Sequence, residues 1–150
     1  MTEERKVVRS CGECTACCKT HYIQELQKLP GVWCKHCSVG IGCKIYDQRP
    51  TECREYACEW LRGSGLESER PDKTGTIIDT MISDDKREAL IRIVEVSENA
   101  IERLRVRQMA EYFLSSGVPV YFVPLHGSGN IELPWGFKPG PILKKIIESR

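Results

Sequence analysis

Nine cysteines lie within the first 58 residues of this chain, and residues 59–150 contain none. Four of them, Cys11, Cys14, Cys17 and Cys18, form the run C-G-E-C-T-A-C-C. A thiolate is among the strongest protein ligands for a soft metal ion, and a C-x2-C turn offers two thiolates to one ion. This density exceeds what the packing of a small domain requires, so the sequence predicts a metal-binding cysteine region.

A disulfide scaffold is the alternative interpretation, because dense cysteine in a short chain is typical of secreted proteins. The first ten residues, however, contain no apolar run that resembles a signal peptide. An odd number of cysteines would leave one thiol unpaired, and a disulfide between the adjacent Cys17 and Cys18 would be strained. We therefore expect a cytoplasmic protein without a membrane segment, in which metal binding is favoured over disulfides or redox-active thiols.

The spacing of the cysteines is compatible with several kinds of metal site. Two C-x2-C pairs, Cys11/Cys14 and Cys34/Cys37, lie about twenty residues apart, as in a zinc ribbon or treble clef. Eight thiols would also suffice for two four-thiolate sites, and the C-x2-C-x2-C opening matches the start of a bacterial ferredoxin motif. Thiolates bind zinc, cuprous copper and iron–sulfur clusters alike, so the spacing leaves the metal open.

Two histidines lie near these cysteines in the sequence. His36 is inside the segment C-K-H-C, where it either completes a mixed sulfur–nitrogen site or is a solvated loop residue. His21 follows Cys18 by three residues and is a less favoured ligand. His126 lies in a glycine-rich turn, and we expect it to be structural or exposed.

A second block, residues 42–54, reads G-C-K-I-Y-D-Q-R-P-T-E-C-R. Together with the C-x2-C-x2-C-C run, this block resembles the CxxCxxCC-type cysteine-cluster family of zinc- or iron-chelating proteins. The likeness covers residues 11–62 and extends to Y-A-C-E-W-L at residues 56–61. The resemblance implies eight metal ligands: Cys11, Cys14, Cys17, Cys18, Cys34, Cys43, Cys53 and Cys58. Cys37 matches the family least well and is the expected spare.

Two arginines flank the proline of the second block. Four thiolates around one Zn²⁺ carry a net charge of about −2. Arg49 and Arg54 are therefore expected to neutralise the site and to donate hydrogen bonds to sulfur. The alternative for each is an exposed side chain paired with a nearby carboxylate, and this alternative weighs more for Arg54.

The pattern changes near residue 62, which divides the chain into a cysteine region at 1–62 and a body at 75–150. Residues 62–74 are rich in glycine, proline and charge and predict a connecting loop. Residues 75–83 and 89–96 alternate as a hairpin, and a third strand is expected at 118–123. The sequence thus predicts an α+β fold in which a metal-organised lobe packs on a small β-β-α-β unit.

The helix between the second and third strands is expected to begin at a cap formed by Ser97 or Asn99. Its apolar positions are Val106, Met109, Ala110 and Phe113, at the spacing of one helix face. Gly117 is expected to end it in a left-handed conformation. A last short helix is expected at 141–149, with Pro141 in its first turn.

Charge and motif content limit the functions that this chain can have. The 22 basic and 21 acidic residues give a net charge of +1, so no nucleic-acid partner is expected. No polar residues of the body form a recognisable catalytic set, and no methyl-donor site supports the methylase activity of some family relatives. The sequence therefore favours a non-enzymatic protein that holds zinc or iron. The alternatives are an iron–sulfur enzyme or electron-transfer protein and, less favoured, a zinc-stabilised module with a protein partner.

Overall fold

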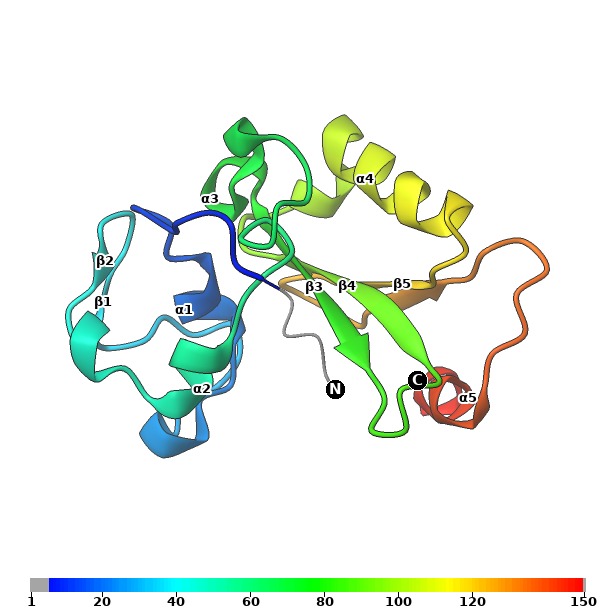
Figure 1. The fold of residues 1–150 in the computed structure, drawn as a ribbon, viewed down its shortest axis with the longest axis horizontal. Helices are drawn as coiled ribbons and strands as arrows, with labels where there is room; N and C mark the ends of the chain where they lie inside the picture. Colours follow the sequence, from blue (N-terminus) through cyan, green and yellow to red (C-terminus); the bar gives the residue numbers. More distant parts are fainter. Residues whose placement is uncertain (1–5, 150) are drawn as a thin grey trace.

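The computed structural model describes residues 6–149, which form a mixed α/β structure with two β-sheets and five α-helices. The larger sheet has four strands, and its strand order follows the chain (Figure 1). These strands are β3 (Thr76–Ile82), β4 (Ala89–Glu95), β5 (Val120–Val123) and β6 (Asn130–Glu132). The predicted order of two strands, a helix and a third strand is present in this body.

Strands β3 and β4 form an antiparallel hairpin in which Ile77 pairs with Val94 and Ile78 pairs with Ile93. Its turn is held by the Ser83 hydroxyl, which donates to Asp85 over 2.6 Å. Strand β5 pairs with β4 in parallel, and β6 pairs with β5 antiparallel. A parallel pair needs a crossover connection, which α4 (Leu104–Ser115) provides.

Helix α4 lies across one face of the sheet (Figure 1). The hydrophobic core between them consists of Ile91, Ile93, Ile101, Val106, Ala110, Val120 and Phe122. Ile93 and Val120 are fully buried. Because alternate residues of a strand point to opposite faces, Ile77 and Val94 lie on the other face, where the cysteine region packs.

The helix starts later than the sequence predicts. Asn99 adopts a left-handed conformation with φ of 57°, and a 3-10 turn covers Ala100–Glu102 before α4 begins at Leu104. Ile101 and Ala100 are buried in this turn, so core packing holds the segment outside the regular helix. Gly117 has φ of 84°, as expected for the residue that ends the helix.

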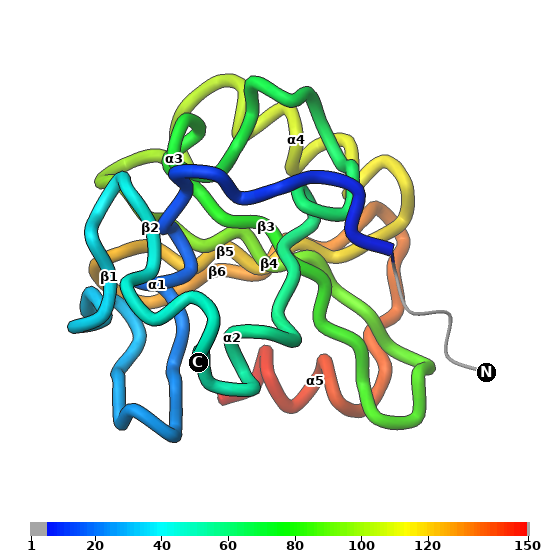
Figure 2. The backbone as a smooth tube through the Cα atoms, turned by 60° about the vertical axis from the view of Figure 1, so that its left-hand side comes forward, coloured from blue at the N-terminus to red at the C-terminus, as the bar shows by residue number. Residues whose placement is uncertain are grey.

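The cysteine region contains only short elements. These are α1 (Ala16–Thr20), β1 (Cys37–Ser38), β2 (Gly42–Cys43), α2 (Thr51–Glu55) and 3-10 turns at Gln24–Leu26 and Tyr46–Gln48. Figure 1 shows them gathered at one end of the molecule, beside β3 and away from α5 (Pro141–Glu148), and Figure 2 shows this end brought forward. A small apolar cluster joins this region to the sheet: Ala16 and Cys58 contact Ile77 and Val94.

The connecting segment 62–74 is more ordered than the predicted loop. It contains a 3-10 turn at Glu67–Glu69 and the short helix α3 (Pro71–Thr74), which Gly75 ends with φ of 79°. At the far end of the sheet, α5 buries Leu143. None of the helices within residues 6–149 has the length and apolar character needed to span a bilayer.

Candidate metal centre

Short turns and helices position the cysteines of the two C-x2-C pairs. The Cys14 amide donates to the Cys11 carbonyl over 3.0 Å, and the Cys37 amide donates to the Cys34 carbonyl over 3.0 Å. Each pair is therefore closed into a tight turn. The Cys34 amide also donates to the Cys18 carbonyl over 3.0 Å, which ties the second pair to the end of α1.

Seven cysteines from separate segments line one cavity of about 110 Å³. Helix α1 supplies two of them, strand β2 supplies one and α2 supplies one, while the others come from the turns. The seven are Cys11, Cys14, Cys17, Cys18, Cys34, Cys43 and Cys53. All of them belong to the ligand set implied by the family resemblance, so the fold brings most of that set together.

The remaining two cysteines lie outside this lining. Cys58 is 5% exposed and packs in the apolar cluster with Ala16, next to Cys14 and Cys17. Cys37 pairs with Cys43 across the β1–β2 hairpin, and its thiol makes hydrogen bonds with Cys18 and Thr15. The residue expected to be the spare thus lies beside the cluster.

All nine cysteines carry free thiols in this structure. Across residues 6–149, no three or more cysteine, histidine, aspartate or glutamate side chains stand in an arrangement that could hold a metal ion. The thiols therefore converge on one cavity without the geometry of a bound ion. The chemistry of the donors fits a soft metal, because seven of the residues that line the cavity are cysteines and come from different segments.

The thiols act on one another's pKa in two overlapping groups, which are linked by the hydrogen bond between Cys17 and Cys18. The pKa of Cys53 is raised, and burial is the largest cause. The next largest causes are the charges of Cys18, Cys34 and Cys43, so these thiols lie near Cys53. Burial likewise raises the pKa of Cys58 to about 11, with further contributions from Cys11 and Cys14. The first group therefore centres on α2 and the β1–β2 hairpin, and the second lies against the sheet.

Several thiols at or beside this cavity have raised pKa values, which favour their protonated form when no metal is bound. A hydrogen bond with Cys17, followed by burial, raises the pKa of Cys18 far above its ordinary value. Burial raises the pKa of Cys11 and Cys14, and it raises that of Cys37 to about 11. A metal ion that binds here must displace these protons, so its affinity will depend strongly on pH.

Positive charge surrounds the thiols. Arg49 lines the cavity, lies 3.9 Å above the Tyr46 ring and opposes the increase in the pKa of Cys11 and Cys53. Arg54 does not line it; this exposed side chain donates to the Thr51 hydroxyl over 3.3 Å. Arg49 therefore lies at the cavity, as expected from the sequence, whereas Arg54 lies outside its lining.

Two further cations near the thiols were not predicted from the sequence. Lys28 is 7% exposed, and its ammonium group donates to the carbonyls of Lys19, His21 and Leu29. Burial lowers the pKa of Lys28, and the thiols, Cys34 first, oppose this decrease. Arg70 of the connecting segment donates to the Cys11 carbonyl over 3.4 Å. The local sequence does not indicate that Lys28 or Arg70 lies near the thiols, because folding brings each of them close to cysteines from other segments.

A buried polar network joins the cysteine region to the sheet. Tyr56, just after α2, donates through its hydroxyl to Asp79 of β3 over 2.8 Å. Arg92 of β4 donates to both oxygens of the same carboxylate, over 3.0 and 2.7 Å. Asp79 and Arg92 are directly paired across the hairpin. The network therefore fixes the orientation of the cysteine region relative to the sheet.

Two of the three histidines line the cavity, and the third lies elsewhere. His36 lines the cavity, as a ligand would. His21 also lines it, but its ring contacts the Tyr56 ring in a tilted arrangement. The buried Nε2 of His21 lies 4.0 Å from Asp79 and has no hydrogen-bond partner. His126 is exposed and lies 3.3 Å from Glu98. Of the three, His36 fits the cavity best and His21 belongs to the polar network.

Comparisons of the chain with protein-family models, with curated proteins and with solved structures gave no match. The functional argument therefore depends on the chain's own residues and their arrangement.

Proposed function

We propose that this protein is a cytoplasmic metal-binding protein that holds zinc or iron through its cysteine thiolates. One observation carries the proposal: seven cysteines, brought together from α1, β2, α2 and the turns between them, line a single cavity. A protein that used cysteine only for packing would bury isolated thiols among apolar side chains. Here seven thiols line one cavity instead.

We divide the eight expected ligands into two groups of four, one for each metal ion, which adjoin at the hydrogen-bonded Cys17 and Cys18. Cys18, Cys34, Cys43 and Cys53 form the first group, because the other three are the thiols with the largest effects on the pKa of Cys53. Cys11, Cys14, Cys17 and Cys58 form the second, because Cys14 and Cys17 pack on the cluster that buries Cys58 and the Cys11 thiol acts on its pKa. Cys37 is the ninth thiol, and His36 is the alternative nitrogen ligand.

The surrounding residues would stabilise the thiolate form. Four thiolates and one divalent ion leave a charge of about −2 at each site. Lys28 and Arg49 provide positive charge at the first group, and Arg70 lies beside Cys11 at the second. Bound zinc would cross-link the cysteine region, whereas an iron–sulfur cluster would supply electron transfer.

Metal content and colour after anaerobic purification test this proposal directly. We expect about two equivalents of zinc, one for each four-thiolate site, and a colourless protein, because Zn²⁺ has a filled d shell. A brown protein with acid-labile sulfide would instead support the iron–sulfur alternative. Protein that is free of metal as purified and that fails to bind zinc, ferrous iron or a reconstituted cluster would overturn metal binding.

A further inference from the structure

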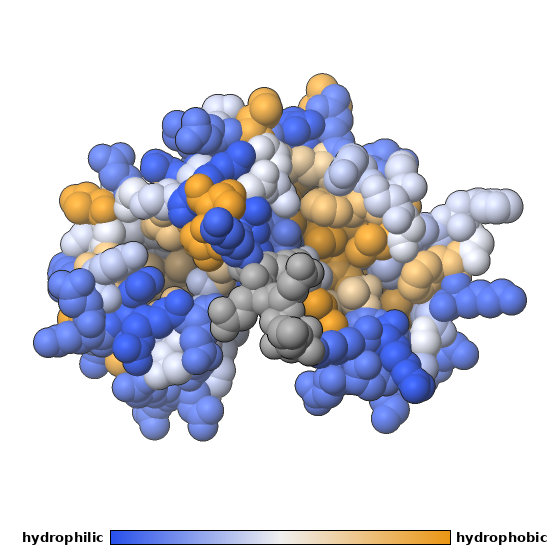
Figure 3. All heavy atoms as spheres, in the orientation of Figure 1, coloured by the Kyte–Doolittle hydropathy of each residue, from blue (hydrophilic) through white to orange (hydrophobic). Residues whose placement is uncertain are grey.

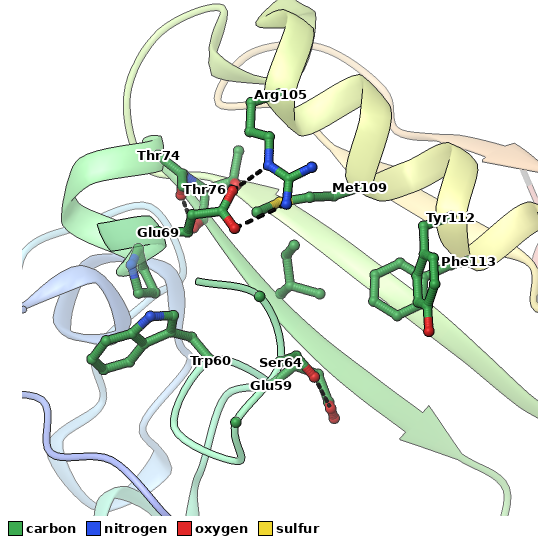
Figure 4. Close-up of a pocket in the computed structure, with 14 residues that line it drawn as sticks. Glu59, Trp60, Ser64, Glu69, Thr74, Thr76, Arg105, Met109, Tyr112 and Phe113 are labelled. Carbon is green, nitrogen blue, oxygen red and sulfur yellow. Dashed lines mark hydrogen bonds and ion pairs between the residues drawn. The ribbon is translucent and has the colours of Figure 1, made fainter. Parts of the chain in front are cut away.

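A second cavity, of about 450 Å³, lies between α4, strand β3 and residues 59–76. No cysteine lines it. Figure 4 shows side chains from α3, α4, β3 and the 59–65 segment pointing into one space, and Figure 3 shows hydrophobic atoms in a hollow beneath α4. Its volume falls in the range of small-molecule sites, which extends from about 300 to 1,000 Å³.

The two carboxylates of the lining already have partners within the protein. Glu69 accepts hydrogen bonds from Arg105 and, over 2.8 Å, from the Leu66 amide. Glu59 accepts a hydrogen bond from the Thr80 hydroxyl over 2.6 Å. A charged ligand would have to break such contacts in order to make new ones, so it would gain little net free energy from them.

The tryptophan of the lining is engaged as well. The Arg9 guanidinium carbon lies 5.1 Å from the centre of the Trp60 ring, and its nitrogens donate to the Ser64 and Gly65 carbonyls over 2.9 and 2.7 Å. The Trp60 indole donates to the Leu66 carbonyl over 3.1 Å. With Arg9 included, two guanidinium groups balance the two carboxylates, and the cavity therefore favours neither a cation nor an anion.

The surface that is left for a ligand is aliphatic and aromatic. Ile78 of β3 and three residues of α4, Met109, Tyr112 and Phe113, line the cavity. Ile78 and Phe113 lie partly buried at the edge of the core between α4 and the sheet, so the cavity extends that core toward the surface. Tyr112 is 69% exposed and lies at the end opposite Trp60 (Figure 4). An apolar group placed here would remove more of this surface from water, which is favourable.

A flexible chain fits this surface better than a flat ring. The Tyr112 and Phe113 rings meet edge to face, with their centres 5.5 Å apart, so they do not form a slot between parallel rings. Arg9 covers the Trp60 ring at the other end. Met109 has an unbranched side chain, which can adjust its shape to a row of methylene groups.

We propose that this cavity binds the alkyl chain of an uncharged molecule, which packs against Ile78, Met109 and Phe113 and leaves its neutral polar end toward Tyr112. Burial of the methylene groups would supply the binding free energy, since the charges around the cavity are balanced and paired. This site is independent of the proposed metal-binding function, because the two cavities share no lining residue.

The test uses the full-length protein with ¹³C in its methionine methyl groups, titrated with butanol, hexanol and octanol. Met109 lines the cavity, and its NMR signal is identified with Met109→Leu, while Met81 lies outside the lining and is the internal control. We expect octanol to shift the Met109 signal, and each added methylene to strengthen binding about three- to fourfold. No Met109 shift with octanol at about 1 mM, an equal shift of Met81, or an affinity that is independent of chain length would overturn the proposal.

Two further probes test whether charge contributes to binding. Hexylammonium and hexanoate have as many carbons as hexanol and differ from it in the charge of their polar end. We expect neither ion to bind more tightly than hexanol, because an ion loses hydration near the cavity without finding an unpaired partner. A preference of about tenfold or more for either ion would show that a charged group recognises the ligand, and the proposal would then be wrong.

Two matched variants and an exposed one locate the contacts. Ile78→Phe should fill part of the cavity and weaken octanol binding at least about fivefold. Ile82→Phe, the same change at a half-exposed position of β3 outside the lining, should leave the affinity unchanged. Tyr112→Ala removes an exposed ring, so it should weaken binding about two- to threefold even if Ile78→Phe fails to fold. Unchanged binding in Tyr112→Ala, or in a folded Ile78→Phe, would contradict the proposed site.

Discussion

Among the thiols, Cys53 and Cys37 offer the sharpest comparison. Cys53 lies near Cys18, Cys34 and Cys43, whereas Cys37 is the expected spare despite its hydrogen bond with Cys18. Cys53→Ser should reduce bound metal by about half, since it removes one primary bond from one of two sites. Cys37→Ser, the matched control, should keep its metal. The bound metal of both variants is measured by elemental analysis. An equal loss of metal in Cys53→Ser and Cys37→Ser would show that the expected ligand set is wrong.

His21 provides a prediction of pH dependence. Burial, and then the charge of Arg92, lower its pKa to about 4 against the opposing effect of Asp79. The ordinary value is 6.5, so the unfolded chain takes up this proton first as the pH falls. The stability that His21 contributes is therefore complete above pH 6.5 and is lost as the pH falls toward 4. Between pH 7 and 5 the loss should be about 2 kcal/mol.

An NMR titration of the His21 Cε1 signal measures this pKa directly, and denaturant unfolding at the two pH values measures the stability. Protonation of the thiolates would also release the proposed metal, so the relevant quantity is the difference between the unsubstituted protein and His21→Gln. The variant should lose less stability on acidification. A midpoint at or above 6.5 for His21 would disprove the buried, neutral imidazole.

Single residues differ in how well the sequence predicts their roles. The thiols were predictable because their spacing is local, and seven of the eight expected ligands line one cavity. Arg49 was expected near the site and lines the cavity, but Arg54, five residues later, does not. The position of Lys28 was unpredictable, because its neighbours Cys34 and Cys53 lie 6 and 25 residues away in the chain.

At the scale of elements, the polar contact between the end of α2 and the β3–β4 hairpin can be tested by a single substitution. Asp79 is 5% exposed and accepts hydrogen bonds from Tyr56 and Arg92. Asp79→Asn leaves the Arg92 guanidinium without its countercharge, which should destabilise the protein by about 2–3 kcal/mol. Denaturant unfolding measures this cost. Asp84→Asn, an exposed turn residue of the same hairpin, should change stability by less than about 0.5 kcal/mol. Similar effects of the two changes would show that the contact is unimportant.

The elements of the body were largely predictable, and those of the cysteine region were not. The alternation of residues 75–83 and 89–96 predicted a hairpin that the structure places at Thr76–Ile82 and Ala89–Glu95. The start of α4 was missed because the buried Ile101 holds a 3-10 turn before it. In the cysteine region the α-helices and strands are two to five residues long, too short for hydrophobic periodicity to reveal them.

For the molecule as a whole, the two hydrophobic clusters predict unequal dependence on metal. The cluster between α4 and the sheet contains no residue of the cysteine region, whereas the cluster around Ala16 and Cys58 joins that region to Ile77 and Val94. Removal of metal with a strong chelator should therefore expose the amides of residues 11–62 to hydrogen exchange. The amides of β4 and α4 should stay protected. Mass-resolved exchange of the same sample before and after chelation tests this, and unchanged protection within 11–62 would contradict it.

The order of the chain has a consequence for biosynthesis. Every cysteine is translated before β3 and β4, the strands whose Ile77, Val94 and Asp79 form the surface on which the cysteine region docks. At about 5–20 residues per second, the ribosome leaves the thiols without that surface for several seconds. The nascent thiols are therefore synthesised before the sheet can pack against the cysteine region, and Cys58 is the thiol that this later packing buries.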